Sequence, residues 1–432
     1  MGTLTTPEKL RELQRALYRR AKENKSFRFY ALYDKVYRKD VLKHAYALVK
    51  AKRGAPGPDG VTFEQIEATG SDGLLEELHE ALKTKGYKPG AVRRVYIPKA
   101  SGGERPLGIP NIRDRVVQMA AKLVLEPIFE ADFEEDSYGF RPKRDAHKAL
   151  EAVEEALQGG MWWVLDADIT AYFDTIPHDR LMKTVAERVV DGSMLRLIKA
   201  FLEAPIIDER DGGGPRRNGQ GTPQGGVISP LLANIYLHLV DRNFRGQVER
   251  GTLKGRLIRY ADDFVVLAPR EPVRERKWLE GVLQRLGLSL HPTKTRMVYA
   301  EKEKFDFLGH TMRWTYVRRI DDHKLYFDIS KKSLQRIRDE LKSRTKHTAL
   351  SIEQVVLNLN TYIRGARQYF RRVVAQRKNK LDYFVYGRVA RWWRRKHKLA
   401  RPAWWLARDG ALWTKYGTER WYHPRSRSEA AR

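Results

Sequence analysis

Two adjacent aspartates, Asp262 and Asp263, interrupt an otherwise apolar stretch of the chain, RYADDFVVLA at residues 259–268. Neighbouring carboxylates repel each other and burial penalises their charged form, so they need a cation or a turn into water. A third aspartate, Asp168, ends another apolar stretch, WWVLDAD at residues 162–168. If the two stretches are neighbouring strands, three carboxylates converge on one edge of a sheet, where cations would resolve their repulsion.

The chemistry that such a cluster supports is in-line phosphoryl transfer. Two Mg²⁺ ions would activate a hydroxyl nucleophile and stabilise a pyrophosphate leaving group. Taken alone, each aspartate is more often a helix cap or a turn residue, so the joint pattern carries the hypothesis. By strand alternation Asp166 shares a face with Asp168, and it is the main alternative ligand.

The charge of the chain points to a polyanionic partner. It carries 83 Lys and Arg against 54 Asp and Glu, a formal net charge of +29 at pH 7. Lys and Arg drive nucleic-acid binding by neutralising phosphates, so nucleic acid is the leading candidate. The rival partner, an anionic membrane surface, is disfavoured because the chain has no hydrophobic stretch of 18 residues and no lipidation motif.

The absence of cysteine restricts the chemistry further. It excludes disulfides, Cys-ligated zinc and thiolate catalysis. The 11 histidines form no HExxH-like ligand pair, so any metal must be held by carboxylates, which favours Mg²⁺ or Mn²⁺. The N-terminus lacks the apolar core and cleavage site of a signal peptide, which predicts an intracellular protein.

The elements that must position the aspartates mix strands and helices without a regular alternation. We expect two short strands around a Gly-Gly turn at 92–110, a strand at 162–170 and a hairpin at 257–268 with residues 261–263 in its turn. Helical spacing of apolar residues predicts a long helix within 112–133. This mixture predicts an α+β domain up to about residue 312 and helices beyond about 328, one opened by a Ser351/Gln354 capping box.

The last 45 residues combine 13 Lys and Arg with six of the ten tryptophans. Basic residues interleaved with aromatic ones suit phosphate contacts beside stacking on unpaired bases. The alternative is a solvated basic helix whose tryptophans pack on the domain beneath, and the two interpretations can both hold.

Several further motifs, in a fixed order along nearly the whole chain, carry a family resemblance. With YADD and DADITAYFD, the chain contains RGAPGPDGVT, IPKASGGERPLGIPNIRDRVVQ, DSYGFRPKRDAHKAL, GTPQGGVISPLLANIYL, LGLSLHPTKT, FDFLGH and LNTYIRGARQYFR. The chain thereby resembles the right-hand polymerase of reverse transcriptases and, more narrowly, the bacterial group II intron-encoded reverse transcriptase/maturase family.

The resemblance implies an α+β right-hand polymerase with an antiparallel sheet, followed by a helical domain. It places an N-terminal helical extension and the start of the fingers at 1–75, and the fingers and palm at 76–312. A helical thumb or maturase X domain would follow at 313–398, and a basic, aromatic DNA-binding tail at 399–432. Because the chain has no cysteine, we expect the HNH endonuclease domain of many family members to be absent.

The resemblance also assigns the metal site. Asp168, Asp262 and Asp263 would be the catalytic metal ligands, joined by the backbone carbonyl of Ile169. They would hold two Mg²⁺ ions, with Mn²⁺ as a possible substitute. Since adjacent residues of a strand point to opposite faces, we expect Asp262 to bridge both metals and Asp263 to contribute less.

Five residues would contact the incoming dNTP. Lys99 and Arg105 flank the ASGGE turn, where two cations can close over a triphosphate. Phe173 would stack under the sugar and exclude a 2′-hydroxyl, although plain core packing is the alternative. Gln224 would lie beside the nucleotide, and Lys294 is a candidate general acid toward pyrophosphate.

The resemblance suggests template and primer contacts at two places. The first comprises Arg141, Pro142 and Gly225, and the second comprises Phe307, Leu308 and Gly309. For Arg141 a structural salt bridge is nearly as plausible. Phe305, Phe307 and Leu308 are also candidates for the core.

The function implied is RNA-directed DNA synthesis for a group II intron. The protein would copy intron RNA by target-primed reverse transcription from dNTPs, and bind intron RNA and target DNA to assist splicing and retrohoming. We expect it in the bacterial cytoplasm, associated with the nucleoid in a ribonucleoprotein, with no membrane partner. Two alternatives are a domesticated relative (CRISPR-associated, diversity-generating or repair) and a splicing-only, RNA-binding maturase.

Overall fold

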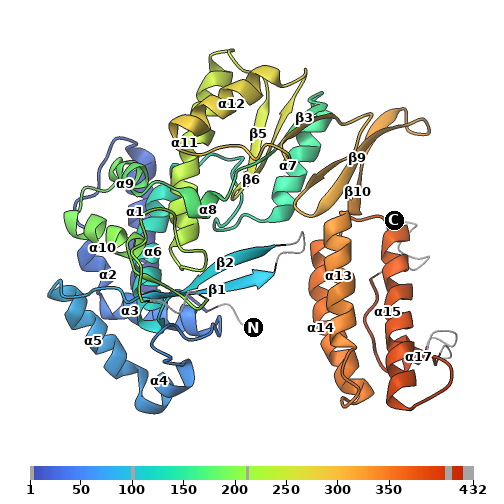
Figure 1. The fold of residues 1–432 in the computed structure, drawn as a ribbon. Helices are drawn as coiled ribbons and strands as arrows, with labels where there is room; N and C mark the ends of the chain where they lie inside the picture. The colour runs from blue at the N-terminus through green and yellow to red at the C-terminus, as the bar shows by residue number, and fades with distance from the viewer. Residues whose placement is uncertain (1–3, 99–102, 211–213, 404–410, 422–432) are drawn as a thin grey trace. The chain divides into compact units, whose positions relative to one another are not determined.

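The computed structural model describes residues 4–98, 103–210, 214–403 and 411–421 (Figure 1). The chain divides into two compact units. The first takes in the chain to Ala156 and then Leu165–Met297, and the second takes in Leu157–Val164 and the chain from Val298 onward. Over the described residues, no helix combines the length and apolar content that a membrane span requires.

A single buried helix, α6 (Ile112–Glu130), organises the first half of unit 1 and packs against α1 and α3 (Figure 1). The apolar residues whose spacing predicts this helix are buried, namely Val116, Val117, Ala120, Leu123, Val124 and Ile128. The polar Asp114, Arg115 and Gln118 of this helix are buried as well. The other helices of the first half are α1 (Glu8–Glu23), α2 (Tyr33–Val36), α3 (Lys39–Lys50), α4 (Phe63–Thr69) and α5 (Ser71–Lys83).

Further helices follow along the chain, and α9 packs against both α10 and α11. They are α7 (Ala146–Gln158), α8 (Tyr172–Thr175), α9 (His178–Ala186), α10 (Gly192–Leu202), α11 (Ser229–Glu249) and α12 (Val273–Arg285). The long helix α11 begins after the loop at 222–226, which has the sequence TPQGG.

The first sheet has the strand order β2-β1-β4. The strands β1 (Val92–Pro98) and β2 (Glu104–Ile109) form the predicted antiparallel pair. The strand β4 (Ile206–Asp208) pairs parallel to β1, so this sheet is mixed and not purely antiparallel.

The second sheet has the strand order β5-β6-β3-β7. Its strands are β3 (Trp163–Asp168), β5 (Arg256–Tyr260), β6 (Asp263–Ala268) and β7 (Arg296–Tyr299), and the boundary between the two units falls within β3 and β7. The two predicted aspartate-bearing stretches are therefore neighbouring strands.

Unit 2 contains a small sheet and a group of long helices. The sheet has the order β10-β9-β8, from β8 (Phe305–Phe307), β9 (His310–Val317) and β10 (Asp322–Ile329). The long helices are α13 (Lys331–Arg344), α14 (Ile352–Tyr369) and α15 (Ala375–Lys396), followed by the short α17 (Ala411–Thr414). The Ser351/Gln354 capping box that opens α14 confirms the prediction, whereas the β9–β10 hairpin was not anticipated.

Candidate active site

The turn that carries Asp262 is shorter than the sequence suggested. Tyr260 pairs directly with Asp263 across the hairpin, so the turn consists of Ala261 and Asp262 alone. Asp263 therefore belongs to strand β6, and the prediction that it lies in the turn was wrong. Ala261 is in the left-handed region (φ 59°). The buried side chains that follow Asp263, including Phe264, hold the hairpin in the core.

Asp168 reaches the same edge of the sheet from β3, the neighbour of β6. Its backbone carbonyl accepts from the His291 amide at 2.7 Å, and the Thr170 amide donates to the Ser289 carbonyl at 2.9 Å. These bonds flank a bridge between Ile169 and Leu290. The end of β3, including the Ile169 backbone, is thus held by the 289–291 segment.

The charges of Asp168 and Asp262 interact at this edge of the sheet. Burial raises the pKa of Asp262, and the nearby charge of Asp168 raises it further, while Arg105 and Arg259 lower it. The Lys294 ammonium lies 2.7 Å from Asp168 Oδ2 and partly neutralises that carboxylate. A divalent cation between the two carboxylates would relieve the same repulsion, so the donor set fits the metal that the sequence predicts.

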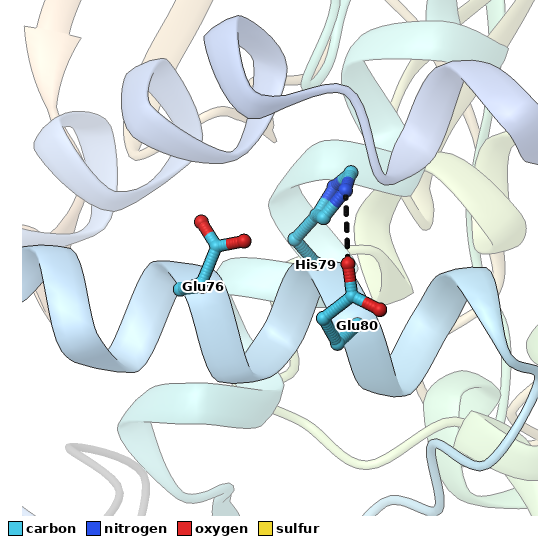
Figure 2. A group of neighbouring side chains, drawn as sticks. All are labelled: Glu76, His79 and Glu80. Atoms are coloured by element: carbon cyan, nitrogen blue, oxygen red, sulfur yellow. Dashed lines mark ion pairs between the residues drawn. The ribbon is translucent and has the colours of Figure 1, made fainter.

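Asp263, the first residue of β6, is exposed. Among the described residues, only Glu76, His79 and Glu80 bring three potential metal ligands within 4.8 Å of one another (Figure 2). Asp168, Asp262 and Asp263 therefore do not all lie within 4.8 Å of one another. The alternative ligand, Asp166, forms an ion pair with Arg296 at 3.4 Å.

The group on α5 in Figure 2 is already neutralised by nearby lysines. Glu76 pairs with Lys39 at 2.6 Å, and Glu80 pairs with Lys83 at 3.4 Å. His79 Nδ1 lies 2.6 Å from the Tyr37 carbonyl. These contacts explain why the three side chains lie together, since both glutamates form ion pairs at the surface.

The predicted nucleotide contacts of the palm surround a small cavity of about 40 Å³. Phe173, Asp174 and Gln224 are among its lining residues. Gln224 Nε2 donates to Asp174 Oδ2 at 3.4 Å, and the Phe173 carbonyl accepts from the Thr222 amide at 2.7 Å. Phe173 is only partly buried, and its ring contacts Tyr172 edge to face.

Gly225 allows the loop before α11 to approach strand β2. Its φ is 116°, and a Cβ there would lie 2.3 Å from the Gly108 carbonyl oxygen. Arg105 on β2 is exposed, and its charge reaches Asp262. Lys99, its predicted partner in binding triphosphate, lies outside the described residues.

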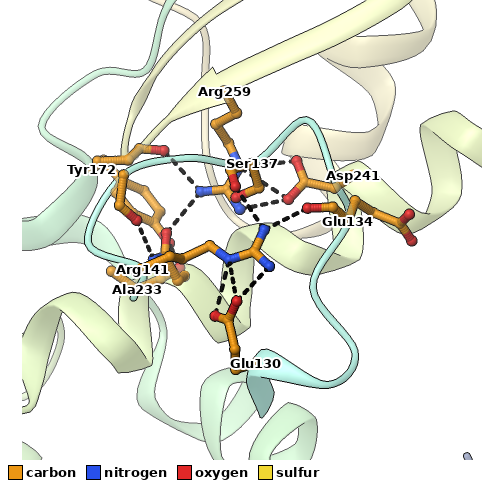
Figure 3. Close-up of polar contacts among 11 residues, drawn as sticks. Glu130, Glu134, Ser137, Arg141, Tyr172, Ala233, Asp241 and Arg259 are labelled. Carbon is orange, nitrogen blue, oxygen red and sulfur yellow. Dashed lines mark hydrogen bonds and ion pairs between the residues drawn. The ribbon is translucent and has the colours of Figure 1, made fainter. Parts of the chain in front are cut away.

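Arg141 is buried, and its guanidinium binds the protein itself (Figure 3). Nη2 donates to Glu130 Oε1 at 2.8 Å, and Nη1 donates to the carbonyls of Glu134 and Ser137. This geometry favours the alternative that Arg141 forms a structural salt bridge. Its guanidinium connects the loop 134–141 to Glu130 at the end of α6. The adjacent Pro142 is exposed.

The second set of template or primer candidates forms the turn between β8 and β9. Phe307 is 4% exposed and belongs to the core of unit 2. The Leu308 carbonyl accepts from the Tyr369 hydroxyl at 2.9 Å. Gly309 has a φ of 73°, and a Cβ there would lie 2.7 Å from Ser333 Oγ. Phe307 therefore fits the alternative that it packs in the core. Ser333 of α13 and Tyr369 of α14 contact the turn and hold it in place.

In the basic C-terminal region, two of the tryptophans favour the packing alternative, and residues 404–410 and 422–432 of the predicted tail lie outside the described residues. Trp392 and Trp421 are buried, and Trp392 Nε1 donates to the His347 carbonyl at 2.9 Å. On the same helix α15, Arg391 and Arg394 are exposed to solvent. The buried tryptophans stabilise a helix whose other face presents cations.

A larger cavity of about 610 Å³ in unit 1 includes none of the predicted site residues. Several of its charged groups are paired with one another, such as Arg188 with Asp132 at 2.9 Å and Arg245 with Glu134 at 2.8 Å. These paired charges leave little net charge to attract an ionic ligand.

Sequence reasoning missed a buried polar cluster behind the Asp262 turn. Arg259 is 1% exposed and forms an ion pair with Asp241, which is 5% exposed (Figure 3). The signal was available, since Arg259 is a charged residue within the apolar RYADDFVVLA stretch. Buried charges of this kind need a partner.

Comparison with known proteins identifies both halves of the chain. Residues 97–312 match the family described as reverse transcriptase (RNA-dependent DNA polymerase). Residues 334–413 match the group II intron, maturase-specific domain. The first match extends across the boundary between the two units, and the second lies within unit 2.

Individual relatives agree with these matches. Protein YkfC of Escherichia coli (strain K12) is 36% identical over 341 residues, covering 70% of this chain and 87% of YkfC. Group II intron-encoded protein LtrA of Lactococcus lactis subsp. cremoris is 34% identical over 328 residues, covering 74% of this chain. The chain spans 53% of the length of LtrA, and 50% of a 27% identical protein in the cob intron of Schizosaccharomyces pombe.

Among solved structures, a chain of a partial Cas6-RT-Cas1–Cas2 complex aligns with a TM-score of 0.36 and 23% identity. The alignment covers 59% of this chain and 41% of that one.

Proposed function

Because the chain belongs to the family of group II intron-encoded reverse transcriptases and maturases, we propose that it copies intron RNA into DNA from a primer in the target DNA. The observation that carries the proposal is the meeting of Asp168 and Asp262 at one sheet edge, from strands that are 94 residues apart in the chain. Two buried or half-buried carboxyls in such proximity suit divalent cations.

In the proposed site, Asp168 and Asp262 would hold two Mg²⁺ ions, with the Ile169 carbonyl and Asp263 as secondary donors. When bound, such ions lower the pKa of a primer hydroxyl and offset the charge that develops on the leaving pyrophosphate. The remaining steps fall to side chains. Lys294, whose ammonium lies 2.7 Å from Asp168 Oδ2, would protonate pyrophosphate at the same edge.

The nucleotide would be selected beside this edge. Phe173 is partly buried on α8 and faces the small cavity shared with Gln224, which suits a ring that excludes a 2′-hydroxyl. Arg105, with Lys99, would neutralise the triphosphate. Pro142 is exposed and remains the candidate for a template contact. Arg141 would act indirectly, because it holds the loop 134–141 in place.

For unit 2 we propose intron RNA binding that assists splicing. Support comes from the maturase-specific match over residues 334–413 and from the exposed arginines of α15. The tail from residue 399 would add contacts to target DNA. Such a protein would work in a ribonucleoprotein at the bacterial nucleoid, where its target DNA is found.

The proposal places the thumb or maturase X domain at 313–398, after fingers and palm at 76–312. A splicing-only maturase is the competing function, and the retained aspartates argue against it, because RNA binding alone has no use for half-buried carboxyls whose charges repel each other. A domesticated polymerase would share the same active site and differ in its RNA partner.

The experiment that tests the polymerase is an Asp262→Asn substitution assayed by primer extension on an RNA template. We expect the rate of dNTP incorporation to fall by at least ~10³-fold, since several kcal/mol of metal-dependent stabilisation are lost. Binding of intron RNA and of the template–primer duplex should remain near that of the unsubstituted protein.

The matched control is Asp72→Asn, which removes the same charge from an exposed position on α5. It should extend primers at the unsubstituted rate. Full polymerase activity of Asp262→Asn would contradict the proposed metal site.

A further inference from the structure

The turn that presents Asp262 is held in an uncommon backbone conformation. Ala261 has a φ of 59°, a region that residues other than glycine rarely adopt, and it is 8% exposed. The Ala261 carbonyl accepts a hydrogen bond from Arg259 Nη1 at 3.0 Å. Arg259 thus bonds to the backbone of the residue immediately before Asp262.

Arg259 is itself fixed by two side chains of helix α11 (Figure 3). Its Nε donates to Asp241 Oδ1 at 2.9 Å, and its Nη1 donates to Asn234 Oδ1 at 2.9 Å. Asp241 and Asn234 are both buried and lie seven residues apart, so they share one face of α11. The guanidinium is planar and its donors are rigidly arranged, so these bonds define its orientation.

The same helix also anchors the segment that follows Asp168. The Tyr172 hydroxyl, which is buried, donates to the Ala233 carbonyl at 2.6 Å (Figure 3). Tyr172 precedes Phe173 in α8. One stretch of α11 therefore fixes both the Asp262 turn and the start of α8.

A loop braces the turn from another side. Asn234 Nδ2 donates to the Gly139 carbonyl at 2.7 Å. A Cβ on Gly139 would lie 2.3 Å from the Ala261 nitrogen, so the two backbones are in direct contact. The Tyr138 amide donates to the Arg259 carbonyl at 2.8 Å. Asn234 thus bonds to both the arginine and the loop.

We propose that Asn234, Asp241 and Arg259 are positioning residues for Asp262, which set the place of its carboxylate at the sheet edge. The inference rests on the proposed polymerase function and deepens it. None of the three has to touch substrate, because each acts through the Ala261–Asp262 turn. Catalysis is sensitive to such placement, since a shift of about 1 Å in a reacting group can cost ~10²-fold in rate.

The test compares Asn234→Ala with Asn243→Ala on the same helix. Asn243 is exposed and donates to the Leu239 carbonyl of its own helix. For Asn234→Ala we expect the single-turnover incorporation rate to fall by about 10–100-fold. The template–primer dissociation constant should change by less than about threefold, because no binding contact is removed. Asn243→Ala should match the unsubstituted protein in both.

Two further measurements separate positioning from loss of folded protein. Arg259→Lys keeps the charge, but an ammonium cannot span Asp241, Asn234 and the Ala261 carbonyl, so we expect a similar fall in rate. Mn²⁺ binding to the protein–duplex complex, followed by electron paramagnetic resonance, should weaken by about tenfold in Asn234→Ala. Thermal melting confirms that each variant is folded at the assay temperature.

An Asn234→Ala protein that is folded and incorporates dNTP within twofold of the unsubstituted rate would overturn the inference. So would a fall in rate that is matched by an equal loss of duplex binding, which indicates general disruption. The Asp262→Asn variant separates this outcome from failure of the proposed function. If Asp262→Asn is inactive while Asn234→Ala is normal, the polymerase assignment stands and only the positioning role fails.

Discussion

Replacing Gly139 by alanine should slow DNA synthesis without touching any catalytic group. A Cβ at position 139 would lie 2.3 Å from the Ala261 nitrogen and 2.9 Å from the Tyr260 carbonyl carbon. Both contacts are backbone atoms, which cannot rotate aside as a flexible side chain can. Ordinary van der Waals contact begins near 3.4 Å, so the turn, the loop or both must retreat by roughly 1 Å in total.

The magnitude follows from that displacement. A retreat of about 1 Å at the residue before Asp262 corresponds to a loss of ~10²-fold in rate when the reacting group is misplaced by the same amount. Overpacking of this kind also destabilises the fold by about 1–3 kcal/mol. Gly139 does not have a left-handed φ, so its backbone conformation is one that alanine readily adopts. Any fall in the rate would therefore come from the contact between the new Cβ and the Ala261–Asp262 turn.

The assay is single-turnover incorporation of one dNTP on an annealed RNA template and DNA primer. The matched control is Gly73→Ala on α5, where a Cβ would meet nothing within 4 Å. Alanine there should leave the rate unchanged and slightly favour the helix. A Gly139→Ala protein that is folded and incorporates dNTP within twofold of the unsubstituted rate would refute the reasoning.

Two other changes test different parts of unit 1. Phe173→Ala should raise ribonucleotide incorporation relative to dNTP by about 10–100-fold, measured by single-nucleotide extension, and an unchanged ratio would remove its role in sugar selection. Burial lowers the pKa of His238 to about 4, below the ~6.5 of an unfolded chain. The unfolded state therefore binds the proton first, and stability is lost as the pH falls from 6.5 toward 4. The free energy of unfolding should drop by about 2 kcal/mol between pH 7 and pH 5 from this group. His238→Phe should lack that part of the slope in urea titrations, and an identical slope in both proteins would show that another group is responsible.

The sequence alone determined the strands that carry the aspartates. Two apolar stretches have the length of strands, and carboxylates end one of them and interrupt the other. Because few structures tolerate like charges in apolar surroundings, these carboxylates identified Asp168 and the Asp262 hairpin as a site. Local signals also predicted the long buried helix α6 and the capping box of α14. Such features depend on residues within a few positions of each other, so the order of residues along the chain is enough to predict them.

Only the tertiary structure decided which side chains from different parts of the chain contact one another. Arg141 is a candidate template contact by sequence, and Arg259 is one of many arginines in a basic protein. Each is buried against a carboxylate supplied by another element, Glu130 and Asp241 respectively. The hairpin register, fixed by the pairing of Tyr260 with Asp263, moved Asp263 from the turn into the strand. Partner choice and register depend on contacts between distant segments, and the free energy of those contacts exists only once the helices and strands have packed together.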